Sequence, residues 1–281
     1  MGEANVNPKS LETWNGYVNS AKRLNAVLIP RGIEAIYLNG ASNSPDLWYP
    51  YLWMMGGEIL KLKSGHPTKG YYWFPAFNST EGVKALEFLK LQVDAGIKPQ
   101  KNDFFGLEFL DRKFAVMIEA LQHHIGDKFP ITSEQKAEFE RKVGFIPMFP
   151  VPDTSYQTST FMGGWEFSIP KTSLNKDLAW ELLTIMLEPR ILAPYLASHS
   201  NLPTQISIGE GPYAQDLNNT TPYYDELIGL IKIARTRPNI PEYSQIAENI
   251  RQAIDQVYNG TRDPRHALDE AATVSARVLG W

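Results

Sequence analysis

The sequence predicts an α/β fold, and two observations carry that prediction. Short apolar, β-prone runs such as Glu34–Asn39 and Phe114–Ile118 alternate with longer segments of helical periodicity, an alternation typical of α/β proteins. The chain has 281 residues, 43% of them hydrophobic and 21% charged, so it can bury a core without disulfides. This length allows one large domain or two ordinary ones.

The longer segments are predicted to be helices because their apolar residues recur at helical spacing. Ser10–Leu28 begins with Ser10 as a candidate N-cap. Phe77–Gly96 has Ser79 or Thr80 as its cap and a glycine as its stop. The same criteria predict helices over the aromatic stretch that ends at Gly56-Gly57 and over 104–112, 175–188, 193–199, 222–234, 245–258 and 264–279.

Four short apolar runs are predicted to be strands: Glu34–Asn39, Phe114–Ile118, Val143–Pro147 and Phe167–Pro170. The first two are followed by loops with polar side chains. Ligand sites of α/β sheets collect at the carboxyl ends of strands. Residues that follow these strands are therefore candidates for ligand contact.

Composition excludes several kinds of protein and site. The chain has no cysteine, which excludes disulfides, thiolate metal ligands and a cysteine nucleophile. The net charge is −4 and no dense Lys/Arg block occurs, so we expect no nucleic-acid partner. Short basic groups such as Arg235-Thr236-Arg237 and isolated histidines such as His66 are expected to be solvated. No apolar run reaches the ~20 residues of a membrane span, and we expect no signal peptide within this chain.

Aromatic and polar side chains occur together in the predicted loops. The chain has 7 Trp and 13 Tyr, and several aromatic residues cluster in 47–53 and 71–77. Flat rings beside Asp, Asn and Gln suit a ligand with apolar faces and polar edges, as a sugar has. Trp165 follows Gly163-Gly164, where backbone and ligand can approach closely. The candidate binding residues are Asn43, Ser44, Asp46, Trp48, Gln122, His123, Trp165, Glu166 and Tyr243.

Several of these candidates also have a purely structural interpretation. Trp165 would be a core tryptophan after a turn, and Asn43 to Trp48 would be the capped start of a helix. Glu119 lies four residues before His123, which suggests a metal-ligand pair. No third ligand is evident, so we expect neither a metal nor a cofactor.

An enzyme is the main alternative to a binding protein. Asp46, Glu119 and Glu166 are the carboxylates that a glycosidase would use beside the aromatic residues. No spacing singles out an acid–base pair, however, and the G-x-S-x-G, P-loop and HExxH motifs are absent from the sequence. We therefore expect no catalysis.

Several stretches match, in one order, the sequence patterns of a known family. Asn78–Gly96 resembles "FNSPEGVEALQFLVDLYKAGI", and Gly163–Pro189 resembles "GGWGLAIPKGSKNKEAAWEFLKFLTSPE". Shorter patterns are matched by Asn7–Trp14, Phe114–Glu119, Leu202-Pro203-Thr204 and Asn259–Leu268. The chain thus resembles extracellular solute-binding protein family 1, the sugar-binding proteins of ABC importers that include maltose-binding protein.

The resemblance implies a type II periplasmic-binding-protein fold and a function without chemistry. Such a protein captures a sugar or oligosaccharide between two lobes that close by a hinge motion, and delivers it to an ABC permease. It works in an extracellular or periplasmic location. A glycosidase-like enzyme and a non-binding structural remnant remain the alternatives.

The position of Trp14 departs from the family pattern. In the family, most of the first lobe precedes the tryptophan helix, whereas here that helix begins the chain. The resemblance therefore implies a truncated or split protein, mainly the C-terminal lobe. Residues 1–155 and 205–281 would form this lobe, and 156–204 would cross to a fragment of the N-terminal lobe. The apolar helix in 156–204 would then associate with a chain that supplies the missing lobe, or with a second copy.

Overall fold

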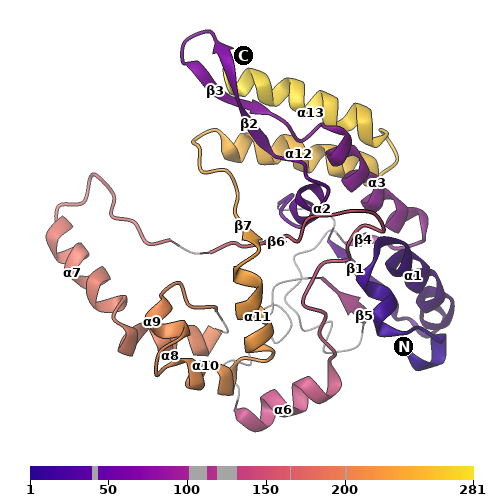
Figure 1. The fold of residues 1–281 in the computed structure, drawn as a ribbon, viewed down its shortest axis with the longest axis horizontal. Helices are drawn as coiled ribbons and strands as arrows, with labels where there is room; N and C mark the ends of the chain where they lie inside the picture. The colour runs from indigo at the N-terminus through magenta and orange to yellow at the C-terminus, as the bar shows by residue number, and fades with distance from the viewer. Residues whose placement is uncertain (40–43, 101–112, 119–131, 165, 200) are drawn as a thin grey trace.

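A computed structural model of the chain describes residues 1–281 apart from 40–43, 101–112, 119–131, 165 and 200. Its helices and strands form a large body around one hydrophobic core, a second and smaller group of helices, and an arm that carries one further helix (Figure 1). Two short paired strands, β6 (Thr160–Phe161) and β7 (Ala234–Arg235), run between the body and the smaller group. This mixture of helices and strands confirms the predicted α/β class.

The central sheet of the body is parallel and has the order β4-β1-β5 among the described residues. Strand β1 (Glu34–Asn39) lies between β4 (Pro99–Gln100) and β5 (Phe114–Met117), with Ile36 paired to Val116. The sequence predicted β1 and β5 correctly. Because both strands run in one direction, the loop that follows β1 begins at the carboxyl edge of the sheet.

The N-caps of two helices of the body, α1 and α3, test the caps predicted from the sequence. The N-cap of helix α1 (Trp14–Leu28) is Thr13, whose hydroxyl accepts from the Gly16 N–H at 3.2 Å. The prediction of Ser10 as the cap is wrong, because Ser10 lies in a preceding 3₁₀ helix and its hydroxyl donates to the Asn7 carbonyl. Helix α3 (Thr80–Asp94) is capped by Ser79, as predicted. The 3₁₀ helices of this region are Gly2–Ala4, Pro8–Glu12 and Ile29–Arg31.

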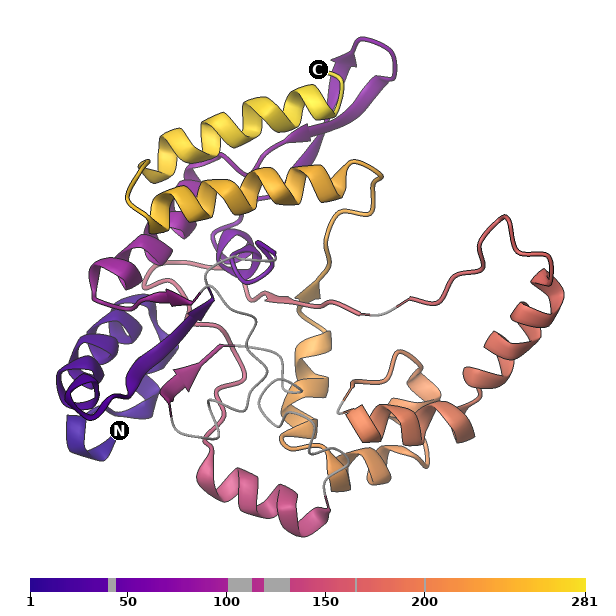
Figure 2. The same ribbon diagram turned by 180° about the vertical axis from the view of Figure 1, so that it is seen from behind.

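Helices α12 (Tyr243–Tyr258) and α13 (Pro264–Val278) lie side by side over the body (Figures 1 and 2). The Asp263 side chain accepts from the His266 N–H at 3.1 Å, and Pro264 takes the first helical position, as the sequence predicted. The predicted inward face of α12 is confirmed, since each of its members is at most 2% exposed: Ile246, Ile250, Ala253, Ile254 and Val257.

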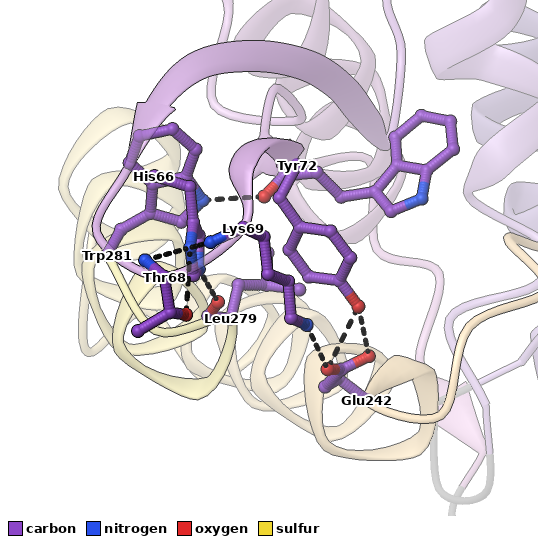
Figure 3. Close-up of polar contacts among 8 residues, drawn as sticks. His66, Thr68, Lys69, Tyr72, Glu242, Leu279 and Trp281 are labelled. Atoms are coloured by element: carbon purple, nitrogen blue, oxygen red, sulfur yellow. Dashed lines mark hydrogen bonds and ion pairs between the residues drawn. The ribbon is translucent and has the colours of Figure 1, made fainter.

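A β-hairpin packs against the C-terminus of the chain and forms hydrogen bonds with it (Figure 3). The sequence did not predict this hairpin. It consists of β2 (Leu60–His66) and β3 (Gly70–Pro75). The expectation of a solvated His66 is wrong, because the hairpin folds back on the end of α13 and leaves this side chain 5% exposed. The Trp281 indole donates to the Trp73 carbonyl at 2.7 Å and so closes the same contact.

The smaller group of helices has an apolar cluster of its own. Its buried members come from four successive helices and are Leu192, Ala193, Leu196, Ile208, Leu217 and Tyr224. These helices are α8 (Pro189–His199), α9 (Ile206–Gly209), α10 (Ala214–Thr220) and α11 (Tyr224–Ile231).

Helix α6 (Ser133–Lys142) lies beside this group and was not predicted. The Glu140 carboxylate of α6 accepts from the Tyr223 N–H at 3.0 Å. The predicted strand Val143–Pro147 is wrong, because this segment follows α6 as irregular chain and the Val143 carbonyl accepts from the Tyr223 hydroxyl.

The arm begins after β6 and extends away from the large body to helix α7 (Lys176–Met186), as both views show (Figures 1 and 2). The predicted strand Phe167–Pro170 is wrong, since these residues are irregular. The predicted helix is present, yet no residue of α7 is buried. Its apolar side chains face solvent, with Leu178 66% and Trp180 67% exposed.

Candidate functional site

The structure describes five of the nine candidate binding residues. Ser44, Asp46, Trp48, Glu166 and Tyr243 belong to the described part of the chain. The others, Asn43, Gln122, His123 and Trp165, lie outside the described residues and stay predictions.

Asp46 and Tyr243 meet although 197 positions separate them in the sequence (243 − 46). Asp46 lies between β1 and helix α2 (Tyr49–Met54), and Tyr243 is the first residue of α12. The Tyr243 hydroxyl lies 3.0 Å from the Tyr49 hydroxyl, and a guanidinium nitrogen of Arg237 lies 3.6 Å from Oδ2 of Asp46. We call Asp46, Tyr49, Arg237 and Tyr243 the Asp46 cluster.

Local structure explains why the Asp46 side chain is held in place. The Asp46 N–H donates to the Ser44 hydroxyl at 3.2 Å, and the Trp48 N–H donates to the Pro45 carbonyl at 2.9 Å. These bonds turn the chain into α2, in which every residue is buried. The loop is therefore anchored by a short helix within the core.

Burial controls the protonation of the two phenols. It raises the pKa of Tyr49 well above the usual range, and the neighbouring Tyr243 adds to this effect. Burial also raises the pKa of Tyr243; the Asp46 carboxylate acts in the same direction, while Arg237 opposes it. Both phenols are therefore protonated at neutral pH. In their mutual hydrogen bond one hydroxyl donates, and Tyr243 also has a side-chain hydrogen bond with the Asp46 carboxylate.

Two groups of the Asp46 cluster have unused hydrogen-bonding capacity. Oδ1 of Asp46 is a buried acceptor without a hydrogen-bond partner in the described structure. The Arg237 side chain is 43% exposed, and its ion pair at 3.6 Å is longer than a direct hydrogen bond. The Asp46 carboxylate, the Tyr243 phenol and the Arg237 guanidinium thus lie close together, with Oδ1 of Asp46 buried and Arg237 partly exposed.

Strand β6 brings the glycines before Trp165 to this cluster. The guanidinium of Arg237 lies 5.8 Å from the centre of the Phe161 ring. A Cβ atom on Gly163 would lie 3.2 Å from that ring and 4.0 Å from Arg237, whereas one on Gly164 would meet no described atom within 4 Å. Gly163 thus lies against the Phe161 ring, whereas a side chain at Gly164 would have space.

Arg235, two residues before Arg237, has a different environment. It forms an ion pair with Glu58 at 2.6 Å and lies over the Trp53 ring at 4.9 Å. These contacts attach β7 to the body. The expectation of a solvated Arg235-Thr236-Arg237 loop is correct only in part, because both arginines are half-exposed and each faces a carboxylate.

Trp48 is buried, whereas a tryptophan that stacks on a ligand would expose one face of its ring. It is 1% exposed, and its ring lies in the core beside Tyr49. With Tyr51 and Gln92, among others, it lines a cavity of about 30 Å³ under the loop. Ligand contact by Trp48 stays a prediction, as does contact by the exposed Glu166.

The sequence interpretation missed Tyr49 and Arg237. Arg237 stands directly before Pro238 in the proline-rich loop that leads to Tyr243, and this shared loop was the available signal. Within the described ranges, no three His, Asp or Glu side chains gather in a way that could hold a metal ion. None of the described helices is long and apolar enough to cross a bilayer.

Comparison with protein families finds one match over most of the chain. The family model described as bacterial extracellular solute-binding protein matches residues 4–191. Proteins of Brucella abortus strain 2308 and Brucella suis biovar 1 strain 1330, named only as binding proteins, are 25% identical to this chain over 251 residues. The match covers 86% of this chain and 55% of each relative, so the chain spans about half of their length.

Solved structures with the same fold include sugar-binding proteins. A solute-binding protein of Thermotoga lettingae, bound with alpha-D-tagatose, has a TM-score of 0.75 and 22% identity, covering 99% of this chain and 68% of its own. The GacH receptor of Streptomyces glaucescens, studied unliganded and with acarbose, has a TM-score of 0.74 and 21% identity, covering 99% and 66%. Maltose-bound MalE3 of T. maritima has a TM-score of 0.75 and 20% identity, covering 95% and 66%. These likenesses confirm the type II periplasmic-binding-protein fold.

Proposed function

Because this chain belongs to the bacterial extracellular solute-binding proteins, we propose that it binds a sugar or oligosaccharide outside the cytoplasmic membrane and delivers it to an ABC permease. Binding would be non-covalent, and the ligand would favour a closed state that the permease recognises. Tagatose, acarbose and maltose are the compounds named with the proteins of similar fold. The family and these neighbours are binding proteins, which supports a function without catalysis.

The observation that carries the proposal is the Asp46 cluster. A sugar hydroxyl both donates and accepts hydrogen bonds, so its site needs acceptors and donors at short distance. Oδ1 of Asp46 is a buried acceptor, while Arg237 and one of the two phenols supply donors. The predicted contacts of Asn43, Gln122 and Trp165 would complete the site with amides and an aromatic face.

The division into lobes is also part of the proposal. We place residues 1–155 and 205–281 in one lobe and 156–204 in a segment that crosses to another. The second apolar cluster packs α8 of the crossing segment against α9, α10 and α11 of the first lobe, so the crossing segment would be held to that lobe at this point. The solute would then lie near β6 and β7, the strands next to the crossing.

The exposed face of α7 supports a partner for the 156–204 segment. Leu178, Trp180 and Leu182 are each more than half exposed on this one helix, and large exposed apolar surfaces usually mark an interface. A chain that supplies further lobe structure, or a second copy of this chain, would cover it. Light scattering after gel filtration tests this: we expect self-association or binding of an apolar dye, and a soluble monomer that binds no dye contradicts it.

A panel of tagatose, maltose, maltotriose and acarbose tests the proposed function. We expect at least one compound to raise the melting temperature and to change tryptophan fluorescence, because ligands that bind the folded state stabilise it. The panel should also be incubated with the protein and assayed for released reducing ends. Release would contradict a function without catalysis, and no response to any compound would contradict sugar binding.

A further inference from the structure

We propose that an ordered water molecule binds inside the core of the large body, where it bridges the hydroxyls of Tyr17, Tyr51 and Tyr258. This water site lies next to the loop that carries Asp46. It involves no contact with a sugar, so the water site and the proposed function can each fail without the other.

The cavity of about 30 Å³ that Trp48 helps to line is the place of this site. Four helices of the body each contribute one polar side chain to its wall: Tyr17 (α1), Tyr51 (α2), Gln92 (α3) and Tyr258 (α12). A polar cavity needs about 10–15 Å³ to hold one water molecule. The cavity therefore has room for water at a point where four helices meet.

The three tyrosines of this wall are buried and uncharged. Tyr17, Tyr51 and Tyr258 are 2%, 3% and 8% exposed. Burial raises the pKa of each phenol, and neighbouring phenols add to this effect at Tyr17 and Tyr51. All three hydroxyls are therefore protonated at neutral pH, and each has a proton to donate.

These hydroxyls have no hydrogen bond with another group of the described residues. A hydroxyl without a partner in a protein core costs free energy, and buried polar groups are nearly always paired with protein or with ordered water. The Tyr224 hydroxyl, in the smaller group of helices, also lacks a partner, but less than 1 Å² of it is accessible. The three cavity hydroxyls are not closed in this way, so water can reach them.

One water molecule matches the needs of the three hydroxyls. A buried water typically forms about three hydrogen bonds with polar groups that otherwise have none. It can accept the proton of one phenol and donate its own two protons to the oxygens of the other two. The cavity is too small for a sugar, and protonated phenols carry no charge that would hold a metal ion. The bridge would join α1, α2 and α12.

Crystal structures of the wild type and of Tyr258→Phe, at a resolution that shows ordered water, test the site directly. In the wild type we expect a water oxygen about 2.5–3.0 Å from at least two of the three phenol oxygens. In Tyr258→Phe this water should be lost or displaced. An empty cavity, a side chain that fills it, or direct hydrogen bonds between the phenols would overturn the proposal.

Urea unfolding provides a second readout, with Tyr224→Phe as the matched control. Tyr17→Phe, Tyr258→Phe and the control each remove one buried hydroxyl and nothing else. Loss of a hydroxyl that is bound to water should raise the unfolding equilibrium constant by about 5-fold in Tyr17→Phe and Tyr258→Phe. Tyr224→Phe should leave this constant unchanged or lower it. Equal constants for the cavity variants and the control would contradict the water site.

Discussion

Two consecutive residues at the start of α12, Glu242 and Tyr243, belong to two different polar clusters. Glu242 belongs to the His66 cluster, which we define as His66, Tyr72, Glu242 and Trp281, and the next residue, Tyr243, belongs to the Asp46 cluster. In the first, the Tyr72 hydroxyl donates to the Glu242 carboxylate at 3.0 Å, and the Trp281 indole donates to a backbone carbonyl. In the second, Oδ1 of Asp46 has no described partner and the Arg237 ion pair is long.

The two clusters differ in how fully their polar groups are hydrogen-bonded, and we assign the first to stability and the second to ligand binding. Nδ1 of His66 accepts from the backbone N–H groups of Thr68 and Lys69 at 3.1 and 3.0 Å, so Nε2 carries the proton and donates to the Leu279 carbonyl at 2.8 Å (Figure 3). A cluster that satisfies its own groups has little to offer a ligand. The Asp46 cluster keeps donors and an acceptor for one. We therefore expect changes in the first cluster to act on unfolding and changes in the second to act on affinity.

The largest effect is expected from His66→Ala. It leaves the Leu279 carbonyl and two backbone N–H groups without their partner and opens a cavity, so the free energy of unfolding should fall by about 2–4 kcal/mol. Urea unfolding measures this, with His199→Ala as the control because His199 is exposed. Equal free energies of unfolding for His66→Ala and wild type would contradict a stabilising role of the His66 cluster.

The next effect is alkaline destabilisation. Burial raises the pKa of Tyr49 and of Tyr243, so the folded protein holds these protons above pH ~10, where the unfolded chain releases them. The contribution of these phenols to the unfolding free energy should therefore be constant below that pH and fall above it, by up to about 1.4 kcal/mol per pH unit for each phenol. Burial raises the pKa of Tyr17, Tyr51 and Tyr258 too, so these tyrosines act in the same direction. Urea titrations at several pH values test the sign. Stability that rises above pH ~10 would contradict the burial of these phenols.

A pair of tyrosine variants compares the two clusters directly. Tyr72→Phe removes a hydrogen bond to a carboxylate and should lower the unfolding free energy by about 1–2 kcal/mol with unchanged sugar affinity. Tyr243→Phe should cost less than about 1 kcal/mol of stability and weaken sugar binding by about 10-fold. Denaturation and calorimetry on the same samples give both quantities. The reverse pattern would show that the clusters have been assigned the wrong way round.

The smallest effect on stability is expected from Trp180→Ser. The side chain is 67% exposed on α7, so the unfolding free energy should change by less than about 0.5 kcal/mol. Light scattering should show weaker self-association than in the wild type. Ile254→Ala is the matched buried control, because Ile254 is 1% exposed and its truncation should cost about 2–5 kcal/mol. A large loss of stability in Trp180→Ser would mean that α7 is covered by the rest of the chain.

The sequence predicted the parts of the fold whose signals are local. The inward face of α12, the Asp263 cap and the strand Glu34–Asn39 follow from periodicity and capping, and all are present. The hairpin around His66 was missed, since the burial of His66 depends on Leu279 and Trp281, which follow α13. The prediction of a strand at Val143–Pro147 was wrong, because a β-prone run forms a strand only where a neighbouring strand pairs with it, and the run itself does not show such a neighbour.

The same limit applies to the candidate site. Asp46 and Tyr243 were identified from their loops, and the structure brings them into one cluster with Tyr49. Arg237 was missed although it lies in the same loop as Tyr243, because its ion pair joins it to a carboxylate that is distant in sequence. Trp48 carries the signal of a binding aromatic, but tertiary packing places it in the core.

The central claim is that the unsatisfied Asp46 cluster binds a sugar. Isothermal titration of the wild type and of Asp46→Asn with the tightest-binding panel compound tests it most directly, since this substitution keeps the shape and removes the charge. We predict measurable binding by the wild type, a loss of about 10-fold or more in the variant, and similar urea unfolding for both. Equal affinity of the two proteins, or no binding by the wild type, would contradict the claim.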